Sequence, residues 1–228
     1  MHDPILCPAS GIISRNNWRK AMRTHSFIFA LVLVLMTMAG CAQKGPVLLD
    51  VKFPAAAEVA PAPKPVVGVS PFVDHRGVKS SVVGKKAIPD GQENELVIQG
   101  NSSELVTKRL KDVLAARGIT VKDAVWDMTA EGIKAEGVDL LIGGEIKGLW
   151  VESVSRPFKT NITASVQLRV SLADAAEKKI VRTINLNSKQ ERENVLFSRA
   201  QVEDMLAEAV TAAVSQLLDD EEVKKKIQ

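Results

Sequence analysis

The sequence predicts an α+β fold, a two-layer sandwich in which a mainly antiparallel sheet carries two principal helices on one face. Residues 162–172 alternate apolar and polar side chains with a period of two, which is typical of a strand with one packed face. Residues 101–117 and the segment after residue 198 carry apolar residues at helical spacing. Since an amphipathic helix must cover an apolar surface, we expect these helices to lie on the sheet.

Composition and charge describe a foldable protein rather than a nucleic-acid-binding one. The 228 residues are 46% hydrophobic and 25% charged, as in globular chains. The formal net charge of +3 is confined to residues 1–40, which hold four basic residues and one acidic residue. From residue 41 onward the two signs balance at 26 each. A basic surface for nucleic acid is therefore not indicated.

The chain begins with the features of a secretory signal. Residues 27–40 form an apolar run of 14 residues without a charge, and Arg23 and other basic residues precede it. A basic region, an apolar region and small residues at a cleavage site make up a signal peptide. The run is shorter than the roughly 20 residues that span a bilayer. We expect residues 1–40 to be removed, with Met22 as an alternative start of translation.

Met38-Ala39-Gly40-Cys41 resembles the bacterial lipobox, with Met38 where Leu is commonest. The resemblance implies that Cys41 receives a diacylglyceryl thioether, becomes the N-terminus after cleavage, and is then N-acylated, for example with palmitate. The alternative is an ordinary signal peptide with a cysteine there by chance. Ala42 follows where Asp would signal retention in the inner membrane of enterobacteria. The expected location is the outer membrane, with the protein facing the periplasm.

Residues 41–64 are predicted to be the lipidated N-terminus and a tether rich in proline and alanine. Within this segment, Val47–Phe53 is the one part suited to pair as a short edge strand. Residues 65–228 are predicted to form a single α/β periplasmic domain. The domain contains no cysteine, so its fold depends on its core rather than on disulfides or thiolate metal sites.

The first part of the domain is predicted to hold short strands. Residues 65–73 are apolar and β-branched and predict a strand that ends in a turn at Asp74-His75-Arg76. Val82 and Val83 begin a second short strand, and Pro89-Asp90-Gly91 marks a loop.

A helix is predicted over 101–117, with Asn101 as its N-cap and Gly118 at the position that favours a left-handed backbone. Residues 119–121 then re-enter as a strand, and 129–136 predict a small helix.

From residue 139 onward the pattern predicts a hairpin sheet and a closing helix. Strands are expected at 139–154, 160–174 and 180–188, with a turn at 175–179. Ser198 and Gln201 form a capping box, and Phe197 is placed to contact Val202 across the helix start. An apolar stripe then continues to Leu218.

The order of these features resembles the YajG-like family of bacterial outer-membrane lipoproteins. The shared features are the lipobox, the proline-bearing tether, the Asp74-His75-Arg76 motif, Ala116-Arg117-Gly118 after a helix, and a final helix ending "DDEEVKKKI". The stretch "VDLLIGGEI" is also similar to a strand of TolB N-terminal-like domains and of lipoprotein activators of cell-wall synthases. Both likenesses imply a periplasmic module without catalysis.

No residue set amounts to a catalytic, metal or cofactor site. His75 is the one histidine beyond the signal region, and we expect it in a turn fixed by Asp74 and Arg76 rather than in a zinc or acid–base site. The glycines of "GGEIKG", residues 143–148, favour strand twist or close helix approach over phosphate binding. No serine lies in a G-x-S-x-G motif.

Two further features have a functional and a structural interpretation. The tail "DDEEVKKKIQ" suits a docking peptide, but three acid-first i,i+4 pairs favour a solvated helix end: Asp220–Lys224, Glu221–Lys225 and Glu222–Lys226. Trp126 and Trp150 suit either a partner contact or core filling.

The leading hypothesis is a lipid-anchored, non-enzymatic envelope lipoprotein that serves as an interaction or structural module at the outer membrane. The alternative is an auxiliary subunit of an envelope transport, secretion or cell-wall synthesis machine, and an enzyme ranks third. The expected partners are the membrane, through acyl chains on Cys41, and another envelope protein. No cofactor, metal or nucleic acid is expected.

Overall fold

The computed structural model describes residues 45–55, 65–89, 91–134 and 137–227, which belong to one compact unit. The unit has an α+β fold in which helices lie on one side of a large, mostly antiparallel sheet, as the sequence predicts. Among these residues, no helix is both long and apolar enough to cross a bilayer.

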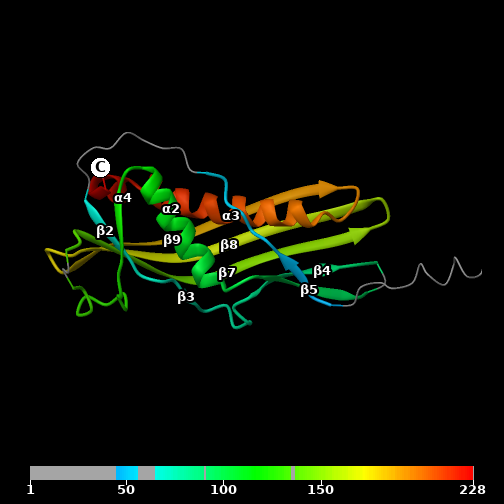
Figure 1. The fold of residues 1–228 in the computed structure, drawn as a ribbon, viewed down its shortest axis with the longest axis horizontal. Coiled ribbons are helices and arrows are strands. Elements are labelled where there is room, and N and C mark those ends of the chain that lie inside the picture. Colours follow the sequence, from blue (N-terminus) through cyan, green and yellow to red (C-terminus); the bar gives the residue numbers. More distant parts are fainter. Residues whose placement is uncertain (1–44, 56–64, 90, 135–136, 228) are drawn as a thin grey trace, which may run out of the picture. The chain divides into compact units, whose positions relative to one another are not determined.

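Three long strands form the body of the sheet (Figure 1). β7 (Leu140–Arg156), β8 (Lys159–Asp174) and β9 (Lys179–Asn194) pair as an antiparallel meander. The period-two pattern of β8 is confirmed, because every second side chain is buried to 2% exposure or less. These side chains are Ile162, Ala164, Val166, Leu168, Val170 and Leu172.

The other edge of β7 is shared by short strands that all run parallel to it. β2 (Val66–Val69) pairs with the start of β7, β3 (Val73–Asp74) with its middle, and β4 (Val82–Ala87) with its last third. The strand predicted at 65–73 is thus divided into two. Ser70, Pro71 and Phe72 separate its two parts.

Three outer strands complete the sheet. β6 (Thr120–Asp123) pairs in parallel with β2. β5 (Glu93–Ile98) forms a hairpin with β4, and β1 (Val47–Leu49) lies parallel to β5 at the edge. β5 was not predicted, because only two of its six side chains are buried and no apolar alternation marks it.

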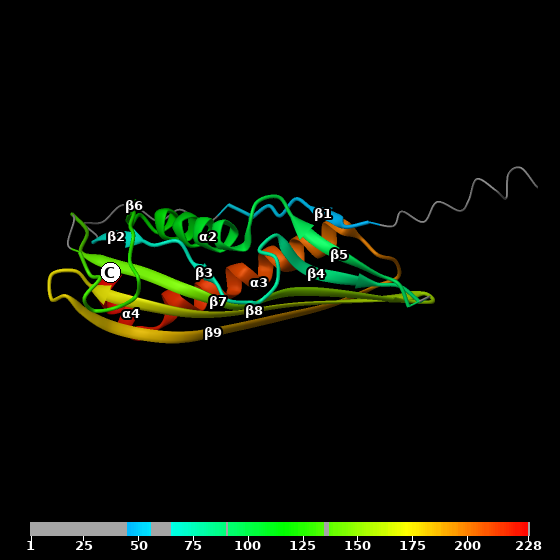
Figure 2. The ribbon, with the colours of Figure 1, turned by 90° about the horizontal axis from the view of Figure 1, so that it is seen from below.

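The helices lie on the face of the meander that carries the buried side chains (Figure 2). α2 (Ser102–Ala116) begins at the predicted N-cap, where the Asn101 side chain accepts a hydrogen bond from the Glu104 amide at 2.8 Å. α3 (Arg199–Asp219) begins at Ser198, whose hydroxyl accepts from the Gln201 amide at 3.4 Å. α3 contacts β8 and β9, and its buried stripe extends to Leu218.

Two local predictions are wrong. Residues 129–134 form turns rather than a helix, because side chains compete for the backbone amides. Asp127 accepts hydrogen bonds from both the amide and the hydroxyl of Thr129, and the Thr129 hydroxyl accepts from the Gly132 amide. The last turns of the chain form a separate helix, α4 (Glu221–Ile227), because α3 ends at Asp219.

The segment 45–55 is joined to the fold. The expected edge pairing within Val47–Phe53 is present as β1, and Leu49 is buried to 1% exposure. The Asp50 amide donates to Glu203 of α3 at 2.7 Å. β1 therefore belongs to the same sheet as the rest of the domain, although its residues lie within the predicted 41–64 tether.

Candidate functional site

Cys41, the predicted lipid-attachment residue, lies outside the described residues, as does the whole of the expected signal peptide. Its lipidation therefore stays a prediction. The other candidate site residues singled out in the sequence lie within the described ranges.

Asp74 and Arg76 form a buried structural cluster. The Arg76 side chain is 4% exposed, and its guanidinium donates to both carboxylate oxygens of Asp74, at 2.9 and 2.8 Å. It also donates to the backbone carbonyls of Ser80, Val82 and Leu149 and to the Ser102 hydroxyl. The hydrogen bonds from Arg76 to the carboxylate are the main cause that lowers the pKa of Asp74. The motif joins β3, β4, β7 and the start of α2.

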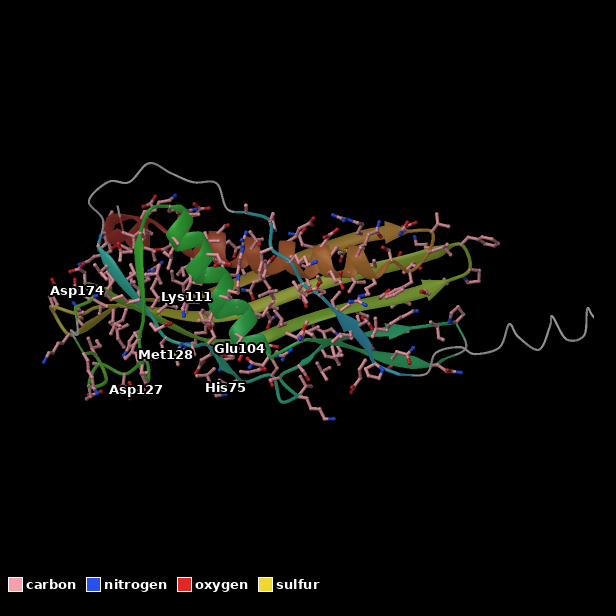
Figure 3. The ribbon with its side chains drawn as sticks, in the orientation of Figure 1. His75, Glu104, Lys111, Asp127, Met128 and Asp174 are labelled. Carbon is pink, nitrogen blue, oxygen red and sulfur yellow. The ribbon has the colours of Figure 1, made fainter. Side chains whose placement is uncertain are left out.

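His75 lies beside this cluster but points to the surface (Figure 3). Its side chain is 49% exposed, and Nε2 lies 3.7 Å from Oε1 of Glu145. Lys147 Nζ lies 2.7 Å from Glu145 Oε2, and its hydrogen bond is the main reason that the pKa of Glu145 is lowered. In the described ranges, no group of three or more His, Cys, Asp or Glu residues is suited to hold a metal ion.

The glycines of "GGEIKG" make room for aromatic rings rather than for a helix. A Cβ on Gly144 would lie 2.5 Å from the Phe72 ring, and one on Gly143 would lie 3.2 Å from Trp126. Phe72 and Trp126 lie over neighbouring residues of β7, and successive strand residues face opposite sides of a sheet. The two glycines therefore let an aromatic side chain pack closely on each face.

Trp126 fills a small second core on the face away from α3. It is 5% exposed, and its indole nitrogen donates to the Thr129 carbonyl at 2.8 Å. Ile133, Leu141, Ala173 and Ala175 complete this cluster. Trp150 lies farther along β7 opposite Ser165 and is partly exposed. Of the two tryptophans, Trp126 has the core role and Trp150 keeps accessible surface.

Arg109 is a buried cation of α2 that links residues 53–54 to α2 and α3. It is 3% exposed, and it donates to the Thr211 hydroxyl of α3 and to the Pro54 carbonyl, both at 3.0 Å. The Phe53 ring lies 5.0 Å from its guanidinium carbon, within cation–π range. Burial lowers the pKa of Arg109. A hollow of about 520 Å³ opens here, between 51–55 and α2.

The C-terminal tail is folded back onto the domain, and its ion pairs differ from the predicted i,i+4 set. Lys226 Nζ lies 2.8 Å from Asp174 Oδ2, and Arg182 lies 3.2 Å from Asp220. Asp220 Oδ1 instead accepts from the amides of Glu222 and Val223 and so starts α4. Val223 and Ile227 are buried, which makes this tail part of the fold.

The most exposed large apolar side chains, besides Val125, gather at neighbouring turns. Phe158, at the turn between β7 and β8, is 92% exposed. Val195 and Leu196, between β9 and α3, are 61% and 73% exposed. β8 and β9 pair from Thr160 and Asn194 onward, so these two turns are adjacent. We call Phe158, Val195 and Leu196 the tip surface.

Comparison with known proteins gives structural likeness only. No protein-family model matches the sequence, and no curated protein is significantly similar to it. A DUF330 protein from Xanthomonas campestris has 12% identity over 76% of this chain and 91% of its own, with a TM-score of 0.48. A homologue of the neuraminyllactose-binding haemagglutinin from Helicobacter pylori has 13% identity over 78% and 95%, at 0.44. A minor lipoprotein from Acinetobacter baumannii has 9% identity over 64% and 95%, at 0.37.

These structures include a bacterial lipoprotein, but none shares enough identity to transfer a function. Membership of the YajG-like family stays a prediction. Two features of the described domain were not predicted: the contacts of buried Arg109 with Phe53, Pro54 and Thr211, and the tip surface. An arginine among the apolar positions of the 101–117 helix was a signal for the first. A phenylalanine directly after a proline, in "SRPFKT", was a signal for the second.

Proposed function

We propose that this protein is a lipid-anchored, non-enzymatic envelope lipoprotein, held by acyl chains on Cys41 at the periplasmic side of the outer membrane. The observation that carries the proposal is Met38-Ala39-Gly40-Cys41 at the end of an apolar run of signal length. Three acyl chains hold a protein far more firmly than one, because each buried methylene contributes about 0.8 kcal/mol.

The described domain supports a binding rather than a catalytic role. Its buried ionic groups, Arg76 with Asp74 and Arg109 with Thr211, are engaged in joining elements of the fold. His75 is half exposed, and the Oε1 of Glu145 lies 3.7 Å from its Nε2, which is longer than the hydrogen bond that acid–base catalysis needs. An interaction or structural module is the role that these contacts favour.

Replacing Cys41 tests the anchor. In cells labelled with a fatty acid, we expect the wild-type protein to carry label in the outer-membrane fraction and Cys41→Ser to lose both the label and that location. Cys7→Ser is the matched control, since it removes the other cysteine of the sequence and should change neither result. Retention of label by Cys41→Ser would refute the assignment.

A partner within the envelope is the second part of the proposal. Trp150 is a partly exposed aromatic residue on the sheet face that α3 does not cover, and such residues anchor many interfaces. Crosslinking of the lipidated protein in native envelopes should capture a partner, with loss of the crosslink in Trp150→Ala. Capture that is unchanged by this substitution would place the partner on another surface.

A further inference from the structure

Three turns of the sheet lie at the same end. β4, β7 and β9 all point toward it in Figure 1. Ala87, the last residue of β4, pairs with Val154, and Arg156 and Lys159 close the β7–β8 hairpin just beyond. The tip surface therefore lies at the extreme end of the sheet. The opposite extreme is the Leu140–Asp174 pair, about 50 Å away at 3.3 Å per strand residue.

β1 connects this end to the predicted anchor. Val47 pairs with Leu96, which pairs with Gly84, which in turn pairs with Val151. Val47 is thus level with Val151, and Phe158 lies about 23 Å farther along the sheet. β1 runs parallel to β5, and β5 starts at the tip end, so the chain enters β1 from that side.

The length of chain between Cys41 and Val47 is short. Six residues span at most about 20 Å when fully extended. A membrane that holds acyl chains on Cys41 must therefore lie within about 20 Å of Val47. The tip surface lies at about the limit of this reach, whereas the far end of the sheet, about 36 Å from the level of Val47 in the other direction, is well beyond it.

The side chains of the tip surface suit a membrane interface. Phe158, Val195 and Leu196 are exposed apolar groups, whereas the neighbouring Phe197 is packed against the core with Lys86 4.0 Å above its ring. Arg156 is exposed beside Phe158, and Lys159, which follows Phe158, lies 2.5 Å from Oε2 of Glu193. Apolar side chains flanked by basic ones are typical of segments that enter the boundary between headgroups and acyl chains.

The backbone conformation at Phe158 is one that a phenylalanine side chain does not favour. Its φ is 61°, in the left-handed region where glycine or asparagine is preferred and a bulky side chain is uncommon. With its side chain 92% exposed, it contributes almost no packing to the domain. A residue that is unfavourable for the turn and unused by the core points to a contact outside the molecule.

We propose that the tip surface enters the headgroup region of the bilayer that holds Cys41, so that the protein stands on the membrane at two points. This inference rests on the proposed lipidation of Cys41. The acyl chains supply the attachment, and the tip surface sets the orientation, with the β7–β9 meander rising from the membrane and its far turn directed away from it.

A fluorescent probe at position 158 tests the contact. In the processed chain Cys41 is a thioether and Cys7 has been removed, so Phe158→Cys carries the one free thiol. The lipidated variant, labelled with bimane, is placed in vesicles of phosphatidylethanolamine and phosphatidylglycerol that contain lipids brominated near the headgroup. Since interfacial side chains reach about 5–10 Å into this region, we expect at least a roughly twofold loss of fluorescence.

Val125→Cys is the matched control, because Val125 is also 92% exposed. It follows β6 near the level of Ile142, far from the tip end, and should show no quenching. A second probe at Leu196→Cys should also be quenched, and less so when Phe158→Asn is present in the same chain. The vesicles contain no other protein, so a contact made only with a protein partner gives no signal.

The mass of the labelled protein separates the two hypotheses. Acyl chains on Cys41 together with equal, low quenching at 158 and 125 would overturn the tip contact and leave the anchor intact. Absence of acyl chains would overturn the anchor and, with it, the orientation. Acyl chains together with quenching at 158 and 196, but not at 125, is the expected result.

Discussion

The turn between β7 and β8 and the turn between β8 and β9 lie at opposite ends of one strand, and they share an unusual backbone. Each places a residue other than glycine in the left-handed region, Phe158 at a φ of 61° and Lys178 at 50°. Their surroundings differ. Asp174, next to the second turn, accepts hydrogen bonds from the Ala176 and Glu177 amides and pairs with Lys226 of α4. Figure 3 shows Asp174 at the end of the sheet away from the β7 and β9 arrowheads.

The two ends of the sheet therefore differ in how their apolar side chains are covered. We call the end at the β8–β9 turn the closed end, because other side chains of the domain cover its apolar groups, whereas apolar groups at the tip end are exposed. At the closed end, α4 and the Trp126 cluster cover the apolar surface. At the tip end, Phe158, Val195 and Leu196 face outward. Exposed apolar groups that gather in this way mark contact sites, whereas single ones do not.

The largest expected effect is at the closed end. Trp126→Ala removes a buried side chain and should lower the free energy of unfolding by about 3–5 kcal/mol. Phe158→Ala, at the tip, should change it by no more than about 0.5 kcal/mol, since its side chain is exposed. Urea unfolding of the two variants measures the contrast. Equal losses would mean that the tip is part of the core.

A smaller, pH-dependent effect is expected at Asp174. The hydrogen bond from Lys226 is the main cause that lowers the pKa of Asp174 from its ordinary value of 3.8. The ionised form therefore stabilises the fold fully above that value, and this contribution is lost as the pH falls through the folded-state pKa.

Asp174→Asn keeps an acceptor for the turn amides but removes the charge. We expect a loss of about 0.5–1 kcal/mol at pH 7, because the ion pair is partly exposed. The gap to wild type should close in acid, as followed by urea unfolding at several pH values. A gap that persists below the folded-state pKa would assign the effect to geometry rather than charge.

An effect of similar size but opposite sign is expected at the two left-handed residues. Phe158→Asn and Lys178→Asn each place a residue that tolerates a left-handed backbone where φ is positive, and each should stabilise the domain by about 0.5–1 kcal/mol. Thermal unfolding measures both. Of these two variants, only Phe158→Asn should weaken contact with vesicles. If Lys178→Asn weakened that contact equally, the two turns would not differ as proposed.

The sequence predicts the long elements well because their signals are periodic. The alternation of Ile162 to Leu172 and the caps at Asn101 and Ser198 each correspond to an observed element. The split of 65–73 into β2 and β3, and the turns at 129–134, depend on tertiary contacts and on side-chain hydrogen bonds that no pattern encodes.

The candidate sites divide in the same way. The turn at Asp74-His75-Arg76 was predictable from its residue types, but the bonds of Arg76 to Leu149 and Ser102 join it to distant segments of the chain. The exposure of Phe158 depends on where the β7–β8 hairpin ends, which the sequence analysis placed only approximately. The adjacency of Phe158 to Val195 and Leu196 requires the register of β8 with β9, which a single sequence does not contain.

The mass of the mature N-terminal peptide tests the central claim most directly. The protein is isolated from bacterial envelopes, digested, and examined by mass spectrometry for the peptide that begins at residue 41. We predict a peptide beginning at Cys41 that carries a diacylglyceryl thioether and an N-linked acyl chain. A mature chain that begins elsewhere, or an unmodified thiol at Cys41, would contradict the account.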